Sequence, residues 1–225
     1  MDNGQLIPEL RFSQFEGGWS SNKFGDIASF SRGKGISKSD IDESGHLECI
    51  RYGELYTHYN EVIDDVISRT NVHKTKLILS EADDVIIPAS GETQIDIATA
   101  SCVKKSGVAL SGDLNIIKSK LNGVFLAYYL NNKKKLDIAR LSQGISVVHL
   151  YSSQLKSLIL NFPDDVEQQK IANFLTAIDQ RITLLKEKKA ALEQYKKGLM
   201  QKIFSQEVRF TDDEGNGFPD WEEGK

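Results

Sequence analysis

The last quarter of the chain carries apolar residues at a spacing that predicts one long amphipathic helix. Between Asp164 and Phe204 there is no proline and one glycine, Gly198. The apolar positions follow each other in steps of four and three residues, which places them along one side of a helix. They are Ile171, Leu175, Ile178, Ile182, Leu185, Leu192, Leu199 and Ile203, and the stripe is interrupted only by Lys189 and Lys196. We therefore predict a helix over residues 164–205.

The length of this helix indicates that it has a partner. Pro163, Asp164 and Asp165 mark its start, because aspartates can accept hydrogen bonds from the free N–H groups there and complement the helix dipole. About 40 residues at 1.5 Å each span roughly 60 Å, more than the preceding domain could cover on one side. A narrow heptad stripe of this length is typical of a coiled coil. The alternative is a solvated helix that packs only on its own domain.

The first 163 residues read as a mixed domain of strands and helices. A helix is predicted over Val124–Leu136, with Phe125, Tyr128, Tyr129 and Leu136 on one stripe. Strands and helices do not alternate regularly, so we expect an α+β fold and not a doubly wound sheet. Short apolar runs bounded by Gly, Ser, Asp or Pro predict strands at Phe24–Phe30, Val85–Ile87, Ile97–Val103, Val108–Leu110, Leu114–Ile117 and Leu158–Phe162.

A segment near the start of the chain is echoed after the long helix. Residues 11–19 read Arg-Phe, a glycine-containing turn and then Trp, and residues 209–221 have the same order. The echo predicts that residues 206–225 are an acidic linker that begins a truncated second copy of the domain. Its position directly after the helix is what makes this short match informative.

Charge is unevenly distributed, which matters for any nucleic-acid partner. The formal net charge is −4, with −1 in residues 1–163, +2 in residues 164–205 and −5 in residues 206–225. Affinity for duplex DNA comes mainly from neutralising phosphates, so this balance argues mildly against tight unaided binding. The acidity lies mostly in the tail, and a nearly neutral domain can still present one basic face.

Several functional classes lack their signatures. Cys49 and Cys102 have no C-x-x-C partner, the four histidines show no ligand spacing, and there is no Walker A loop or dinucleotide fingerprint. We expect buried free thiols, no metal, no cofactor and no catalytic centre. The N-terminus has no signal-peptide pattern and no apolar run approaches the roughly 20 residues that a bilayer requires, so we expect a cytoplasmic protein without a membrane partner.

The entry into the long helix carries a specific family pattern. Residues 161–175 read NFPDDVEQQKIANFL, followed by Ile178-Asp179 and Ile182, and Trp19 precedes Phe24-Gly25-Asp26-Ile27. These features resemble the P…EQ-x-K-I-A-x-x-L…D-x-x-I and W…LGD-I patterns of specificity subunits of type I restriction-modification enzymes, with Phe24 replacing Leu. Gln143-Gly144-Ile145-Ser146 before Leu155 and Leu158 is a looser match.

The resemblance implies a non-catalytic DNA-reading subunit. Members typically carry two target-recognition domains, each followed by such a helix, with the two helices antiparallel, whereas methyl transfer and cleavage belong to separate subunits. This sequence lacks the second half and is either a natural half-subunit or a truncated form. The implied partners are double-stranded DNA, methyltransferase (M) subunits, restriction (R) subunits through the complex, and a second copy or half-subunit along the helix.

Base reading is expected from polar loops of the first domain, because bases are distinguished by hydrogen bonds in the grooves. A solvated charge or an ordinary packed side chain remains the alternative at each position. Two other functions stay open: an assembly protein that reads no sequence, and a small enzyme that modifies or cleaves DNA. The candidate DNA contacts are Arg32, Lys34, Arg51, Tyr52, Ser90, Glu92, Thr93, Gln94, Gln143 and Ser146.

Overall fold

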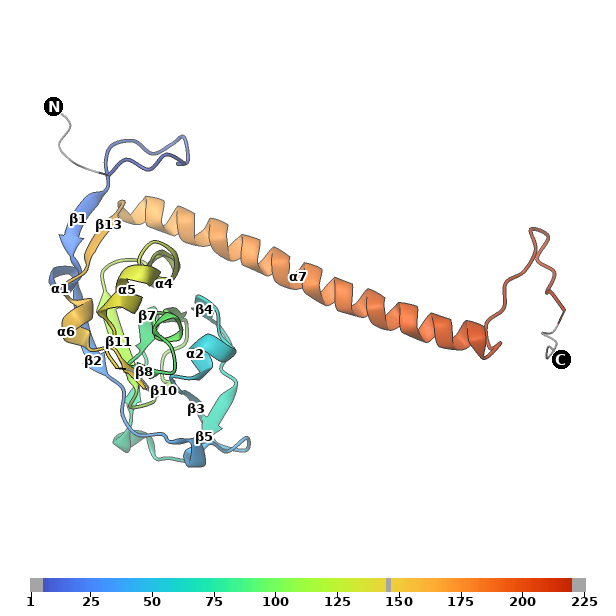
Figure 1. Cartoon of the computed structure of the whole chain (residues 1–225), viewed down its shortest axis with the longest axis horizontal. Coiled ribbons are helices and arrows are strands. Elements are labelled where there is room, and N and C mark those ends of the chain that lie inside the picture. Colours follow the sequence, from blue (N-terminus) through green and yellow to red (C-terminus); the bar gives the residue numbers. More distant parts are fainter. Residues whose placement is uncertain (1–5, 145–146, 220–225) are drawn as a thin grey trace. The chain divides into compact units, whose positions relative to one another are not determined.

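The computed structural model describes residues 6–144 and 147–219 (Figure 1). The chain forms two compact units, residues 1–174 and residues 175–225. The first unit holds the sheets and the short helices, and the second consists of most of the long helix α7 and the segment after it. The predicted α+β class with a long C-terminal helix is confirmed.

A five-stranded sheet forms the centre of the first unit. Its strand order is β2-β11-β7-β9-β4, with neighbours antiparallel except for the parallel pair β4 and β9. Every residue of β7 is buried, as expected for a strand covered on both faces. The strands are β2 (Ala28–Arg32), β4 (Val62–Ile63), β7 (Asp84–Pro88), β9 (Ser101–Val103) and β11 (Leu114–Ser119).

A second sheet of four strands and two short ribbons complete the β structure. The four-stranded sheet has the order β5-β3-β10-β6, and the ribbons pair β1 with β13 and β8 with β12. The strands are β3 (Leu47–Ile50), β5 (Ser68–Thr70), β6 (Ile78–Leu79), β10 (Ala109–Leu110), β1 (Ser20–Lys23), β13 (Ile159–Phe162), β8 (Ser90–Gly91) and β12 (Val148–His149). The short helices are α1 (Phe24–Ile27), η1 (Lys38–Asp40), α2 (Glu54–Thr57), η2 (Lys74–Lys76), α3 (Gln94–Ile97) and α6 (Ser152–Leu155).

The main hydrophobic core joins the two larger sheets. Ile50 and Leu110 come from the four-stranded sheet, whereas Ile86, Val103 and Ile116 come from the five-stranded sheet, and all five are essentially inaccessible to solvent. Burial of this apolar surface is the main force that holds the sheets together. The loops at the ends of these strands are thereby held on a rigid scaffold.

The predicted helix over Val124–Leu136 is wrong in its extent. The structure has two helices there, α4 (Gly123–Asn132) and α5 (Lys135–Leu141). Asn122 caps α4 by accepting a hydrogen bond from the Phe125 N–H at 2.9 Å. Leu136 is 60% exposed and does not continue the buried stripe, because the chain changes direction between the helices. A Cβ at Gly123 would lie 2.4 Å from the Asp83 carbonyl oxygen, so the close packing of α4 requires glycine.

Most predicted strands are confirmed, and two are partly wrong. The runs at residues 85–87, 108–110, 114–117 and 158–162 coincide with β7, β10, β11 and β13. The run from Phe24 begins as helix α1 before β2, and the run from Ile97 begins at the end of helix α3 before β9. At α3 the reason is local, because the Thr93 side chain accepts a hydrogen bond from the Asp96 N–H and caps a helical turn.

The long helix is observed as α7 (Asp165–Phe204), 40 residues, close to the predicted range. Asp164 caps it, since its carboxylate accepts a hydrogen bond from the Glu167 N–H at 2.9 Å. At 1.5 Å per residue it is about 60 Å long. In the described part of the chain no helix combines the length and apolar content that crossing a membrane would need.

Candidate functional site

The loop after β2 lies against the turn between β10 and β11. The Lys34 N–H donates to the Leu110 carbonyl at 2.9 Å, and the Gly33 N–H donates to the Leu114 carbonyl at 3.0 Å. A Cβ at Gly33 would lie 2.0 Å from the Ser111 carbonyl oxygen, so only glycine allows this approach. Two polar loops that are about 80 residues apart in the sequence therefore form one surface.

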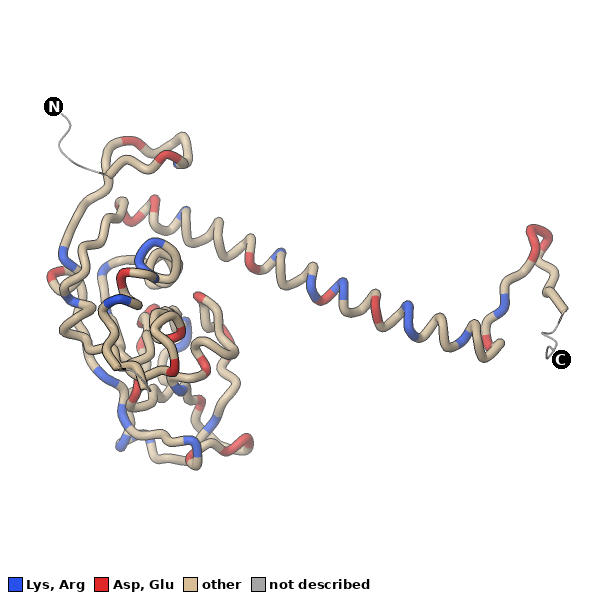
Figure 2. The backbone as a smooth tube through the Cα atoms, viewed as in Figure 1, with Lys and Arg blue, Asp and Glu red and all other residues tan. Residues whose placement is uncertain are grey.

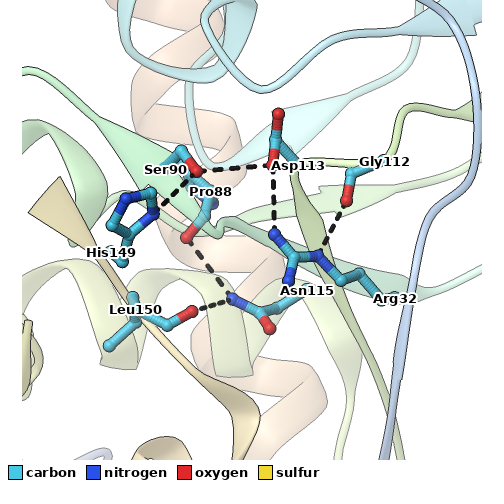
Figure 3. Close-up of polar contacts among 8 residues, drawn as sticks. All are labelled: Arg32, Pro88, Ser90, Gly112, Asp113, Asn115, His149 and Leu150. Atoms are coloured by element: carbon cyan, nitrogen blue, oxygen red, sulfur yellow. Dashed lines mark hydrogen bonds and ion pairs between the residues drawn. The ribbon is translucent and has the colours of Figure 1, made fainter. Parts of the chain in front are cut away.

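A chain of polar contacts crosses this surface (Figure 3). The Arg32 guanidinium donates to the Gly112 carbonyl at 2.8 Å and to Asp113 Oδ1 at 3.0 Å. The Ser90 hydroxyl lies 3.3 Å from the same Asp113 oxygen and 3.2 Å from His149 Nδ1. Because a guanidinium has five N–H donors, Arg32 keeps donors available for a ligand.

Buried Asn115 helps to position this network. Its side-chain amide donates to the Leu150 carbonyl at 3.0 Å and to the Pro88 carbonyl at 3.4 Å (Figure 3). Pro88 ends β7 just before Ser90, and Leu150 follows His149. The buried amide therefore links the segments that carry Ser90 and His149, and such satisfied buried contacts make a site rigid.

Beside this network lies a hollow of about 490 Å³. Its walls combine three loops, and the Gly112–Asp113 turn belongs both to the hollow and to the polar network. Ser111 Oγ is buried without a hydrogen-bond partner in the described residues. The lining residues are Gly35, Ile36, Ser37, Lys38, Asp40, Arg51, Tyr52, Ser111, Gly112 and Asp113.

Aromatic and acidic groups extend the site toward α3. Burial is the main cause that raises the pKa of the Tyr56 hydroxyl above its ordinary value of 10.0. Electrostatic interactions with Tyr52, then Glu92 and then Asp96 raise the pKa further. The Arg51 charge opposes these effects. These interactions indicate that Glu92 lies near the group formed by Arg51, Tyr52 and Tyr56.

The sequence-predicted DNA contacts are only partly brought together. Arg32 and Ser90 share the polar network, Arg51 and Tyr52 line the adjoining hollow, and the Gln143 backbone pairs with that of His149. Lys34, Glu92 and Thr93 are exposed on loops, Gln94 is exposed at the start of α3, and Ser146 lies outside the described residues. Sequence reasoning missed Asp113 and Tyr56. The polar Ser-Gly-Asp turn between two predicted strands was a signal for Asp113, and Tyr56 had none.

The start of α7 is bound to the domain by the residues of the family pattern. Arg11 forms a two-pronged ion pair with Glu167, at 2.8 and 2.6 Å. The Gln168 side chain accepts from the Asn122 N–H at 2.9 Å and donates to the Pro163 carbonyl at 2.8 Å. Gln168 is 1% exposed and Ala172 is also buried. Glu167, Gln168 and Ala172, which all belong to the family pattern, thus have a structural role at the base of the helix.

Further along α7 the large side chains of the apolar stripe are exposed. Its members Ile178, Ile182, Leu185, Leu192 and Leu199 are between 36% and 56% exposed. Charged residues of both signs are spread along the same helix (Figure 2). Among the described residues no group of three His, Cys, Asp or Glu side chains has the arrangement of a metal site.

Comparison with known proteins gives one consistent result. Two specificity subunits of Methanocaldococcus jannaschii type I restriction enzymes, MjaX (putative) and MjaVIII, are 23% and 24% identical over 220 and 212 residues. Each alignment covers 91% of this chain, but only 51% and 47% of the relatives. This chain therefore spans about half the length of the relatives it matches.

Solved structures agree in fold. The S subunit of a type I restriction-modification system from M. genitalium matches with a TM-score of 0.62 at 18% identity, over 89% of this chain and 49% of that one. The HsdS subunit from Thermoanaerobacter tengcongensis matches with a TM-score of 0.54 at 15% identity, over 88% of this chain and 47% of that one.

The sequence model of a protein family, described as type I restriction modification DNA specificity domain, matches residues 16–194. The resemblance seen in residues 161–175 is thereby confirmed, and so is the expectation of a specificity subunit in place of a catalytic one: the chain belongs to the type I restriction-modification DNA specificity domain family.

Proposed function

We propose that this chain is the DNA-reading part of a type I restriction-modification complex and reads one half of a two-part target. The observation that carries the proposal is the family match over residues 16–194, which includes both the sheet domain and most of α7. In this assignment residues 1–163 form the target-recognition domain and residues 164–205 form a spacer and pairing helix. Residues 206–225 begin a second repeat. The protein acts in the cytoplasm and needs no cofactor.

The composite polar surface supports the reading function. It combines hydrogen-bond donors on Arg32, at the end of β2, and Arg51 with acceptors on Asp113 and Glu92, which lie on loops of the sheet domain. Base edges in the major groove differ in their pattern of donors and acceptors, so a mixed surface of this kind can discriminate them. A surface that contacts only phosphates needs hydrogen-bond donors and has no use for carboxylate acceptors.

The exposed stripe of α7 supports pairing with a second helix. Large apolar side chains at heptad spacing are unfavourable in water and become buried when two helices supercoil. We propose that α7 packs antiparallel against another copy, or against a second half-subunit. Two domains would then be held at a fixed separation, which reading two major-groove segments requires. Two identical copies would read an inverted repeat with an unread spacer.

The chemistry of the complex belongs to other subunits in this proposal. The chain recruits methyltransferase subunits directly and restriction subunits through the complex, and it contributes recognition alone. The overall net charge of −4 is in keeping with action inside a complex. The affinity of this chain alone for DNA phosphates is expected to be modest, so the other subunits would add to it.

The test is to co-express the chain with a methyltransferase subunit of its own genome and to map methylated adenines. An interrupted inverted repeat is the result expected for a homodimer, and an asymmetric two-part motif would indicate a different partner half. Methylation without any shared motif would overturn the reading function.

The second candidate is an assembly protein that uses α7 to recruit partners and reads nothing. The exposed apolar stripe fits it equally well. It predicts complex formation with a methyltransferase subunit but the same binding to all DNA sequences. The methylation map separates the two functions, because only a reader produces a motif.

A further inference from the structure

We propose that His149 reads a base amino group, either N6 of adenine or N4 of cytosine, by accepting a hydrogen bond at its unprotonated Nε2. Ser90 and Asp113 select the imidazole tautomer in which Nε2 carries no hydrogen. The proposal rests on the DNA-reading function proposed above and names one residue that determines specificity.

The direction of the hydrogen bonds follows from the chemistry of the groups. Arg32 donates to Asp113 Oδ1 at 3.0 Å, and a carboxylate held by a guanidinium accepts hydrogen bonds without donating any. The Ser90 hydroxyl, 3.3 Å from the same oxygen, therefore gives its single hydrogen to Asp113. Ser90 Oγ can then only accept from His149 Nδ1 at 3.2 Å. This bond places a hydrogen on Nδ1, so in the form of the imidazole that carries a single hydrogen Nε2 is an acceptor.

The backbone holds the imidazole in one place. Ser90 and His149 are paired residues of the β8–β12 ribbon. The His149 N–H donates to the Gln143 carbonyl at 2.7 Å, and the Gln143 N–H donates to the His149 carbonyl at 2.9 Å. The Tyr151 ring stacks beside the imidazole, with centroids 6.3 Å apart and planes 27° apart. A ring fixed in this way has little orientational freedom to lose when it meets a base.

Nε2 is available for a ligand. His149 is only partly buried, and its Nε2 makes no hydrogen bond to any residue in the described ranges 6–144 and 147–219. In the major groove, adenine N6 and cytosine N4 are donors, whereas guanine N7 and O6 and thymine O4 are acceptors. An acceptor at this position favours A or C over G or T at one base of the half-site, by about fivefold for a single hydrogen bond.

The experiment compares methylation maps of the co-expressed complex carrying wild-type chain, His149→Ala, His149→Glu or His149→Lys. Ala removes the contact and should relax one position of each half-site, leaving the other positions unchanged. Glu is an acceptor and should keep the preference for A or C. Lys is a donor and should move the preference at that position toward G or T. Circular dichroism of each variant checks that the fold is retained.

Ser90→Ala tests the role of the network, with Ser153→Ala at an exposed position of α6 as the matched control. Without the hydroxyl the imidazole is free to carry its hydrogen on either nitrogen, so Ser90→Ala should weaken the preference at the His149 position while Ser153→Ala leaves the motif unchanged. A wild-type motif that is identical in His149→Ala would overturn this inference alone. A wild type without any motif would overturn the proposed function and this inference together.

Discussion

At the scale of single residues, the Glu-Gln pair of the family pattern in residues 161–175 has a structural role. Glu167 and Gln168 lie in the first turn of α7, where their side chains bind Arg11 and the backbone of Asn122. Both are almost completely buried although they are polar, and such groups are tolerated only when their hydrogen bonds are satisfied. These residues therefore attach the start of the helix to the sheet domain.

Removing the Gln168 side chain should destabilise the first unit. Gln168→Ala leaves the partly buried Asn122 N–H and the buried Pro163 carbonyl without these partners, at a cost of about 3 kcal/mol for the two groups together. Gln180→Ala, at an exposed position of the same helix, should change the free energy of unfolding by less than about 0.5 kcal/mol. Urea unfolding of both variants measures the difference, and equal midpoints would contradict the structural role of Gln168.

Because the Cys102 thiol is buried, we expect the protein to lose stability at alkaline pH. Burial raises the pKa of the Cys102 thiol from 9.0 to about 12, with Asp83 adding to the effect. Above pH 9 the unfolded chain releases this proton and the native chain retains it, so the unfolded state binds fewer protons and stability falls as the pH rises toward 12. Between pH 8 and 10 the loss is about 1.4 kcal/mol for this thiol.

Urea unfolding at both pH values measures this loss, and Cys102→Ala should reduce the difference between them by about that amount. The buried thiol should also resist iodoacetamide at pH 8 until the protein is unfolded. Rapid alkylation of the native protein, detected by mass spectrometry, would contradict the burial.

At the scale of elements, the two lysines in the apolar stripe of α7 should weaken pairing. Lys189 and Lys196 occupy stripe positions, where their ammonium groups would lose hydration against a partner helix. Replacing both with Leu should tighten self-association by at least about tenfold. Sedimentation velocity over a range of concentrations measures this effect.

The matched control uses the neighbouring residue, because Lys197 lies about 100° further around the helix than Lys196. Lys197→Leu should leave the dissociation constant unchanged, whereas Lys196→Leu alone should lower it. If the wild type and the doubly substituted chain both remain monomeric at high micromolar concentration, α7 does not pair with a second copy.

At the scale of the whole molecule, the acidic segment and the loops proposed to read DNA occupy different parts of the chain. The turn after α7 contains Asp212, Asp213 and Glu214 (Figure 2), and residues 206–225 carry a charge of −5. The sheet domain is nearly neutral at −1. DNA affinity is therefore expected to depend on hydrogen bonds from the loops and on the other subunits, more than on the field of this chain.

The length of α7 should set the length of the unread spacer. Inserting one heptad, that is seven residues, into the segment from Lys186 to Lys189 lengthens the helix by about 10 Å and keeps the apolar stripe in phase. In an antiparallel pair this separates the two domains by the same distance, which corresponds to about three base pairs. The methylation map should show the two half-sites unchanged and the spacer longer by that number. A spacer of unchanged length would contradict the proposal that the length of α7 sets the distance between the two half-sites.

The sequence by itself determined the features that depend on local pattern. The heptad stripe, the capping Asp164 and the motif at residues 161–175 predicted α7 and the family, because helix formation and helix ends depend on near neighbours in the chain. The apolar runs of β7 and β11 were recognisable for the same reason.

Only the tertiary structure decided which polar loops share a surface. Arg32 and Asp113 are 81 positions apart in the chain, and Ser90 and His149 are 59 apart, yet they form one network. Local pattern contains no information about such contacts, since they result from the order of strands in the sheets and from the close approach permitted at Gly33. The break between α4 and α5 likewise does not follow from the apolar stripe of that segment, which continues across it in the sequence.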